Sequence, residues 1–304
     1  MKSIRPYLIV TTSIHLLLAT SPVLATDLKA EYDKKLKTFH YQPVKDACNN
    51  CQLVWKFTDA KAYTYSYRQQ LVNTTNIRLV GTDKGPIDSN QNADFTGVLD
   101  IISTEPNHIK LELKNLSGNM LMEIPTGEKK QMTQKMPPMV IEGLTADGTN
   151  MKTQAGEAFL YLALFPVSKE TLKPGKTIEI PMAMPFNAGN TNLLVKGKAD
   201  VTLSQMVKMT KCQCAQVDVK INLNQLEVPK ELNGEYSFAA SGYSRLFYDV
   251  NKGKYIEGVM YLDMSMAMDV KIPKQQASQL KAKKIPERAQ MKMHNQNLYY
   301  LELQ

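Results

Sequence analysis

Four cysteines carry the clearest chemistry in this 304-residue chain. Cys48 and Cys51 are three positions apart, and Cys212 and Cys214 are two apart. An even number of cysteines favours disulfide bonds in an exported chain. A bond between Cys212 and Cys214 along one extended strand would be strained, because residues two apart lie near the outer limit of disulfide geometry. We therefore predict two bridges that join the first pair to the second and clamp the N-terminal segment onto the outside of a sheet.

Three other roles for the cysteines stay open. Cys48 could pair locally with Cys51. A Cys-x-x-Cys motif could be redox-active, although such motifs usually open a helix beside a βαβ unit, which this sequence does not predict. Four thiolates could also bind zinc or copper(I). The even count in an exported chain favours structural disulfides over these functional roles.

The chain has 17 methionines, several of them in Met-x-Met pairs. Thioethers are soft ligands, and this spacing can serve copper(I). The metal hypothesis uses Cys48, Cys51, Cys212, Cys214, Met291, Met293 and His294. Most other methionines share the apolar phase of a predicted strand, which favours core packing or the lining of an adaptable apolar cavity. The residues predicted to line such a cavity are Met182, Met184, Val201, Met260, Met264, Met266 and Met268.

Motifs that would indicate catalysis are absent from the sequence. Beyond the first 25 residues there are three histidines, His40, His108 and His294, and no two of them form a metal-binding pair. We find no Gly-x-Ser-x-Gly elbow, phosphate-binding loop or dinucleotide fingerprint. We therefore expect a protein that is not an enzyme and uses no cofactor.

The elements that would position these residues are mostly strands. Apolar and polar residues alternate over 178–186, 193–203, 215–223 and 260–270, which is the period of a half-buried antiparallel strand. We predict about ten long strands, mostly consecutive and antiparallel. The expected fold is all-β with minor α content: a large twisted antiparallel sheet or an open or half β-barrel, with a short N-terminal helix and a basic C-terminal tail.

Few segments predict a helix. Residues 27–39 form one candidate, with Asp27 as its N-cap. Residues 156–165 fit either a short buried helix or a further strand, and 274–293 fit a loose helix. Glycine, proline and polar residues predict turns at 173–176 and 251–254 and a longer loop at 83–92.

The first 25 residues are predicted to be a secretory signal peptide. A basic start with Lys2 and Arg5 precedes an apolar run at 8–19, and Val23-Leu24-Ala25 supplies a cleavage site. The run is shorter than the roughly 20 residues of a membrane span. We expect a periplasmic or secreted bacterial protein with no transmembrane span after cleavage. The predicted organisation is a signal peptide at 1–25, a helix and Cys-x-x-Cys segment at 26–51, a sheet domain at 52–273 and a basic tail at 274–304.

The formal net charge of +8 is concentrated near the C-terminus. Residues 271–304 hold seven basic and two acidic residues, so the chain from 26 to 270 is close to neutral. A nucleic-acid-binding protein would spread basic residues over a folded face with aromatic residues between them, so we expect no nucleic-acid partner. The tail is predicted to be a solvated segment, with contact to an anionic envelope surface through 271–304 as the alternative.

Two turns carry a resemblance to other proteins. The Leu172-Lys173-Pro174-Gly175 turn and the segment Leu246-Phe-Tyr-Asp-Val-Asn-Lys-Gly-Lys254 each precede a predicted strand. Together with the strand-rich body at 52–273, they resemble a group of exported bacterial β-proteins of undefined function. In that group an aromatic-Asp-x-x-x-Gly phrase precedes a long Met-rich strand. The resemblance implies an all-β exported protein and carries over no catalytic residues.

The sequence leads to three hypotheses about function. The first is an exported non-enzymatic binding protein whose sheet cups an apolar ligand, either a lipid or a lipidated or extended peptide. It follows from a long sheet with a continuous apolar face and few helices to cover it. The second is a periplasmic metal-handling protein that binds copper(I) through Cys and Met. The third is a structural or adhesive cell-surface module.

Overall fold

The structure is a computed structural model that describes residues 27–45, 48, 51–58, 60–82, 85–123, 127–153, 158–188, 191–228, 234–271 and 288–304. The predicted signal peptide lies outside these residues, and so does most of the predicted helix at 274–293. Within the described ranges, no helix is long and apolar enough to cross a bilayer.

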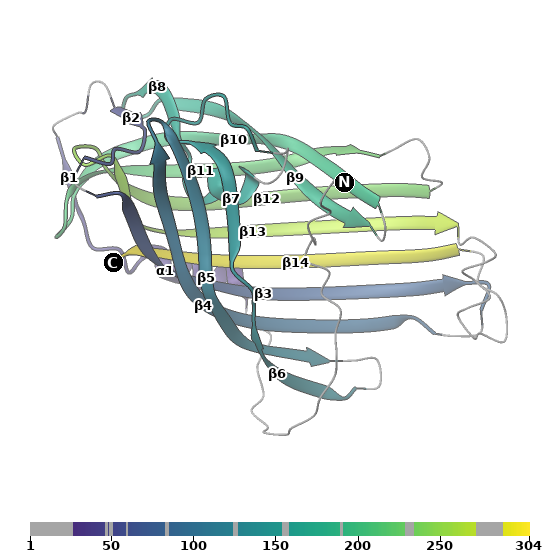
Figure 1. The fold of residues 1–304 in the computed structure, drawn as a ribbon. Coiled ribbons are helices and arrows are strands. Elements are labelled where there is room, and N and C mark those ends of the chain that lie inside the picture. Colours follow the sequence, from purple (N-terminus) through teal and green to yellow (C-terminus); the bar gives the residue numbers. More distant parts are fainter. Residues whose placement is uncertain are drawn as a thin grey trace.

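A twelve-stranded antiparallel sheet dominates the fold (Figure 1). Its strands are β1 (Gln42–Val44), β3 (Ala62–Val80), β4 (Ile87–Glu105), β5 (His108–Glu123), β6 (Lys129–Lys135), β7 (Met139–Thr145), β9 (Thr177–Ala188), β10 (Thr191–Lys208), β11 (Gln213–Glu227), β12 (Gly234–Asp249), β13 (Lys254–Lys271) and β14 (Arg288–Leu303). Their order in space is β1-β10-β11-β12-β13-β14-β3-β4-β5-β6, with β7 also paired to β5 and β9 to β10. The described strands form a sheet that does not close on itself. Their predominance over helices confirms the predicted all-β class with minor α content.

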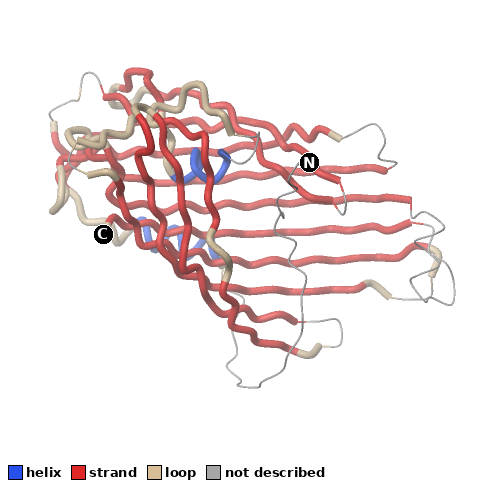
Figure 2. The backbone as a smooth tube through the Cα atoms, viewed as in Figure 1, coloured by secondary structure: helices blue, strands red, loops and turns tan. Residues whose placement is uncertain are grey.

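A second sheet and two helices complete the described elements. Strands β2 (Cys51–Leu53) and β8 (Ser168–Leu172) pair with each other. Helix α1 spans Leu28–Leu36 and helix α2 spans Ala158–Leu164, so the segment that fitted either helix or strand is a helix. Both helices lie toward the same end of the large sheet (Figure 2).

Strict alternation of side chains gives the large sheet two chemically different faces. Along β13, Met260 and Leu262 are buried on one face, whereas Asp263 and Ser265 point to the other. We call these the inner face, which packs against α2, and the outer face, which packs against α1. Over 234–247 of β12, 257–271 of β13, 288–303 of β14 and 65–80 of β3, the strands pair without a register shift. Residues of the inner face are therefore paired with residues of the inner face on the next strand, and outer with outer.

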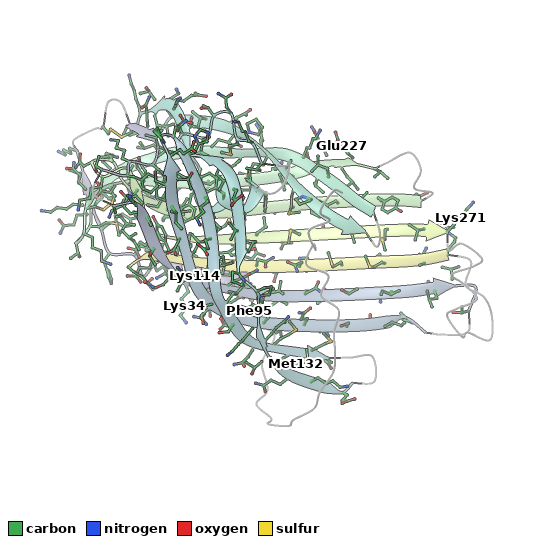
Figure 3. The ribbon with its side chains drawn as sticks, viewed as in Figure 1. Lys34, Phe95, Lys114, Met132, Glu227 and Lys271 are labelled. Atoms are coloured by element: carbon green, nitrogen blue, oxygen red, sulfur yellow. A yellow bond between two sulfur atoms is a disulfide. The ribbon has the colours of Figure 1, made fainter. Side chains whose placement is uncertain are left out.

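One end of the sheet curls around a dense core, while the other extends as a single layer (Figures 1 and 3). Aromatic rings fill the curled end. The ring of Trp55 contacts those of Phe165 and Tyr255, with centroids 5.4 and 5.6 Å away. Helix α2 supplies Tyr161, whose hydroxyl oxygen accepts a hydrogen bond from Trp55 Nε1 at 2.9 Å. The protein's own side chains therefore occupy the inner face at this end.

Helix α1 covers part of the outer face. Asp27 caps it, because Oδ1 accepts hydrogen bonds from the backbone N–H groups of Lys29 and Ala30 at 3.0 and 3.1 Å, as predicted. Leu28 and Tyr32 then enter a second, smaller core on the outer face. The members of that core from the sheet are Val207, Cys214, Phe247, Ile256, Val259, Tyr261 and Leu298.

Two bulges flank the central strands and help to bend the sheet. A Cβ atom on Gly118 would lie 1.9 Å from the backbone oxygen of Asp94, and one on Gly197 would lie 2.0 Å from that of Asn222. The pairing register shifts between Lys196 and Gly197 in β10, and between Thr96 and Val98 in β4, close to the residue that pairs with Gly118. Bulges increase local twist and bend a strand, and glycine allows the close backbone approach. The two flanks can therefore rise from the plane of the central strands.

The prediction of a basic C-terminal tail is wrong for residues 288–303. They form β14, which pairs with β13 on one side and β3 on the other. The cations Arg288 and Lys292 occupy the outer phase of this strand, while Met291 and Met293 occupy the inner phase. Counting charge over the whole segment hid this alternation. Residues 272–287 of the predicted tail lie outside the described residues.

The predicted turns have mixed outcomes. Gly175 and Gly253 adopt positive φ angles of 81° and 61° in the turns at 173–176 and 251–254, as the sequence indicates. The polar loop predicted at 83–92 is shorter, because β4 begins at Ile87. Its polar residues belong to a strand whose outer face meets water.

Candidate functional site

The extended end of the sheet presents a row of paired methionines on its inner face. Met266 of β13 lies directly opposite Met293 of β14, and Met268 lies opposite Met291. Their neighbours across the sheet are aromatic, aliphatic or small. We define the methionine trough as the inner-face residues of this end, namely Ile77, Thr75, Tyr236, Phe238, Met264, Met266, Met268, Met291 and Met293.

The trough is only partly covered by protein. Met266 is 4% exposed, but Met264, Met268, Met291 and Met293 are only partly buried. Ile87, which pairs with Ile77 at the end of the row, is 37% exposed. The helices and the aromatic core lie toward the curled end, so the strands form a single layer here (Figure 3). Unbranched methionine side chains adapt readily to the shape of a partner.

The inner face of the extended end carries no charged side chain on the five described strands at its centre. This holds for the inner-phase residues of β12 from 236 to 244, β13 from 260 to 270, β14 from 289 to 299, β3 from 67 to 79 and β4 from 87 to 95. Charges on the same strands lie on the outer face, where Arg68 pairs with Asp94 at 2.6 Å and Arg288 with Asp269 at 2.7 Å. The sheet therefore separates an apolar inner face from an ionic outer face.

A ladder of amide side chains lies on the inner face between the trough and the aromatic core. The hydroxyl of Tyr67 donates to Gln69 Oε1 at 3.1 Å, and Gln69 Nε2 donates to Asn297 Oδ1 at 2.9 Å. Asn297 Nδ2 in turn donates to Asn295 Oδ1. Asn297 is only 3% exposed, so this chain of hydrogen bonds satisfies amides that would otherwise be buried at a cost.

The ladder ends in a buried polar atom that has no partner. Asn73 lies directly opposite Asn295 in the β3–β14 pairing. Asn73 Oδ1 is buried and accepts no hydrogen bond in the described structure. Asn295 uses its oxygen in the ladder, and its amide nitrogen donates to no described residue. Of these two facing amides, only the Asn73 oxygen is among the buried polar atoms without a partner in the described residues.

Two tyrosines at the base of the ladder stay protonated at neutral pH. Burial raises the pKa of the Tyr67 hydroxyl well above its ordinary value, with the neighbouring Tyr299 adding to the shift. Burial likewise raises the pKa of Tyr299. Both hydroxyls therefore act as neutral hydrogen-bonding groups, and the inner face stays uncharged.

The outer face carries an aspartate–histidine pair next to a serine. Asp263 Oδ1 lies 2.8 Å from His294 Nε2, and Ser265 lies opposite His294 in the pairing. Desolvation opposes ionisation, but hydrogen bonds from Gln296, Tyr261 and His294 outweigh it and lower the pKa of Asp263. Among the described contacts, none joins Ser265 to His294; Ser265 and His294 are exposed, and Asp263 is partly buried. This arrangement fits a hydrogen-bonded pair on the surface of the sheet better than an activated nucleophile.

The predicted cysteine pairing is wrong. The structure joins Cys48 to Cys51 and Cys212 to Cys214, each with Cα atoms 5.5 Å apart. The prediction assumed a fully extended chain from 212 to 214, in which Cα atoms would be about 6.6 Å apart. Instead, Cys212 closes a turn that begins at Met209, where the backbone N–H of Met209 donates to the carbonyl oxygen of Cys212. The N-terminal segment still lies on the outer face, held there by α1 and by the pairing of β1 with β10.

The residues of the metal hypothesis do not converge. All four cysteines are in disulfides, so none supplies a thiolate. Met293 faces the trough, whereas the next residue, His294, faces outward toward Asp263. In the described residues, no group of three or more His, Cys, Asp and Glu side chains could hold a metal ion.

The predicted apolar-ligand residues divide between the two ends of the sheet. Met264, Met266 and Met268 lie in the trough, while Met260 and Val201 are buried in the main core. Met182 and Met184 lie on β9, opposite Gly197 and Val195 of β10. The sequence reasoning missed the trough roles of Ile77, Tyr236, Phe238, Met291 and Met293, and the whole amide ladder. The alternation from Ala289 to Leu301 could have identified β14 as a strand that contributes to both.

Comparisons with known proteins add little. No protein-family model and no curated protein matches the sequence. The crystal structure of Pseudomonas aeruginosa OccK7 (OpdD) aligns with 80% of this chain and 99% of that chain, at 9% identity and a TM-score of 0.21. A TM-score this low carries no argument about shared function. The β-rich fold implied by the sequence resemblance is confirmed by the structure, and export stays a prediction.

Proposed function

We propose that this protein is an exported, non-enzymatic binding protein whose methionine trough holds the apolar chain of a lipid. The observation that carries the proposal is the single-layer end of the sheet, where an uncharged, methionine-rich inner face is left partly exposed. A sheet face of this kind is stabilised when it buries its apolar surface against a second layer. A lipid chain would supply that layer.

Burial of hydrocarbon against the trough gives a sufficient driving force. Each buried methylene contributes about 0.8 kcal/mol, so even partial cover of an acyl chain outweighs the cost of ordering it. The thioethers of Met264, Met268 and Met291 can shift rotamer to follow chains of different shape. This favours a site that accepts a class of acyl chains over one that fits a single rigid molecule.

The free edges of the sheet favour a lipid over an extended peptide. A peptide would add as a strand to an open edge and pair with its backbone. Edge strand β9 contains Pro181 and Pro185, which lack the N–H groups that such pairing needs. On the opposite side of the sheet, the edge strand β6 carries Lys129, Lys130 and Lys135, and lysine on an edge opposes strand addition.

Native mass spectrometry of the mature protein, exported by a bacterial host, tests the proposal. We expect a lipid-sized adduct on the wild-type protein. Met268→Lys places a charge in the trough and should abolish the adduct, because an unpaired ammonium against hydrocarbon is costly. Ala267→Lys is the matched control, since Ala267 is the adjacent residue on the outer face, and its adduct should persist.

The same experiment distinguishes the other hypotheses. A folded wild-type protein that carries no lipid and takes up none from vesicles would contradict the proposal. It would favour a surface module that acts through contacts with other macromolecules. A copper(I) adduct on the protein with both disulfides intact would instead favour a metal site formed by methionine thioethers, because no cysteine thiolate would be free to bind. N-terminal sequencing of the exported protein should begin at Thr26.

A further inference from the structure

We propose that a hollow on the outer face of the extended end binds a neutral oligosaccharide. The hollow has a volume of about 780 Å³ and crosses the five strands β12, β13, β14, β3 and β4. This volume lies within the usual range for sites that bind small molecules. The hollow is on the face opposite the methionine trough, so the inference goes beyond the proposed function and does not depend on it.

Short side chains line most of the hollow, so its floor lies close to the backbone of the sheet. Ser237 and Ala239 of β12 pair with Ala267 and Ser265 of β13. On the next three strands the lining continues with Lys292, His294, Thr74, Asn76, Asp88 and Asn90. All of these residues have the outer phase of their strands, and all except Ala267 and Asn76 are exposed. A ligand in solution can therefore reach them.

The polar groups of the hollow keep hydrogen-bonding capacity for a ligand. In a neutral His294, donation from Nε2 to Asp263 Oδ1, 2.8 Å away, makes Nδ1 an acceptor, and Nδ1 has no partner among the described contacts. Asn76 Nδ2 donates to Asp88 Oδ1 at 2.6 Å, which holds both side chains in place and leaves the oxygen of Asn76 as an acceptor. The hydroxyl of Thr74 takes part in none of the described hydrogen bonds. Sugar hydroxyls both donate and accept, so they suit this mixture of groups.

The charges of the hollow favour a neutral ligand. The lining contains one lysine, Lys292, and one aspartate, Asp88, which lie in the same row with Asn76 between them. Two strand spacings put their Cα atoms about 10 Å apart. Together they carry no net charge, whereas a polyanion such as nucleic acid requires a basic face. A protein partner would require aromatic or aliphatic anchors, and the outer-phase lining supplies only the methyl groups of Ala239 and Ala267.

An exposed aromatic ring lies on the same face beyond one end of the hollow. Tyr243 of β12 shares the outer phase of Ala239 and is 39% exposed. The four residues of strand between them span about 14 Å. The C–H face of a sugar ring can pack against an aromatic ring. A saccharide that extends from the hollow along β12 would meet Tyr243, which favours an oligosaccharide over a single sugar.

Calorimetric titration of the full mature protein with three trisaccharides tests the inference. Cellotriose and chitotriose are neutral, and trigalacturonate is acidic. We expect saturable binding of at least one neutral trisaccharide and weaker binding of trigalacturonate. If neither neutral trisaccharide binds, or if trigalacturonate binds more tightly than both, the inference is wrong.

Substitutions then assign the binding to the hollow. Ala267→Lys fills the hollow and should weaken trisaccharide binding at least tenfold, whereas Met268→Lys changes the adjacent residue on the inner face and should leave it unchanged. Thr74→Val removes one hydroxyl and should weaken binding several-fold, because one hydrogen bond is lost. Thr133→Val makes the same change on the outer face of β6, outside the hollow, and should have no effect.

The lipid adducts of the same variants separate this inference from the proposed function. The adduct should persist on Ala267→Lys, which also shows that this variant is folded, and should disappear from Met268→Lys. That order is the reverse of the order expected for the trisaccharide. Trisaccharide binding that Ala267→Lys does not weaken would overturn the inference and leave the proposed function standing. A wild-type protein that binds the trisaccharide but no lipid would contradict the proposed function alone.

Discussion

Truncation of two methionines on the same face of β13 tests the division of the sheet into a filled core and an open trough. Met260 and Met268 share one strand and one phase, so Met260→Ala and Met268→Ala remove the same atoms in the same backbone setting. Met260 is 1% exposed in the main core, whereas Met268 is only partly buried beside Tyr236 and Met291.

The burial difference sets the expected magnitudes. Met260→Ala leaves a cavity among packed side chains and should lower the free energy of unfolding by about 3 kcal/mol, within the usual range for buried methionine. Met268→Ala removes atoms that already meet solvent in the ligand-free protein, so the loss should be about 1 kcal/mol or less. Urea unfolding of delipidated protein, with the slope checked for constancy, measures both values.

The affinity for an acyl ligand should instead be reduced more by Met268→Ala than by Met260→Ala. Met268→Ala should weaken binding of an acyl ligand several-fold, since it removes apolar contact area from the trough. Met260→Ala should leave binding nearly unchanged under conditions where it is folded. Equal destabilisation by the two substitutions would show that the extended end is covered by protein, and the reasoning about the trough would be wrong.

Three further predictions concern the outer face, the disulfides and pH. Asp27→Ala should lower the free energy of unfolding by about 1 kcal/mol, as measured in urea, because two N–H groups of α1 lose their acceptor. A non-reducing digest should release the Cys48–Cys51 and Cys212–Cys214 bonds in separate peptides, and one peptide linking the two pairs would contradict the structure. Burial opposes ionisation of Asp147, but hydrogen bonds from Lys169 and Thr149 lower its pKa, so its contribution to stability is present above about pH 4 and lost as the pH falls through the lowered value. Asp147→Asn should therefore destabilise the protein at pH 7, and the loss should shrink steadily as the pH is lowered below about 4; a loss that stays constant with falling pH would argue against the ion pair.

The sequence predicted the sheet where its signal was periodic over many residues. In β13, Met260, Leu262 and Met266 alternate with Tyr261, Asp263 and Ser265, and this alternation required no knowledge of neighbouring strands. The same signal exists in β14, but the basic residues were counted as a block and the period was overlooked. The period becomes visible when Arg288, Lys292 and His294 are seen as one face of a strand.

The pairing of residues across strands could not be predicted from the sequence. The trough depends on Met293 lying opposite Met266, and the asparagine pair depends on Asn73 lying opposite Asn295, more than 200 positions away. A shift of one residue in either register would turn one of these side chains to the other face. The local disulfides likewise depended on a turn geometry that residue spacing alone left open.

The length of the strands argues that the extended end has a purpose beyond stability. β3 has 19 residues and spans about 63 Å, whereas strands in globular domains usually have three to ten residues. Its first part supplies Tyr63, Tyr65 and Tyr67 to the main core, and Leu71 packs against that core. If the remainder served only to continue the sheet, both of its faces could be polar. Instead the inner phase of the central strands stays uncharged to the open end and places four methionines in facing pairs, as expected of a surface that is covered when a ligand is bound.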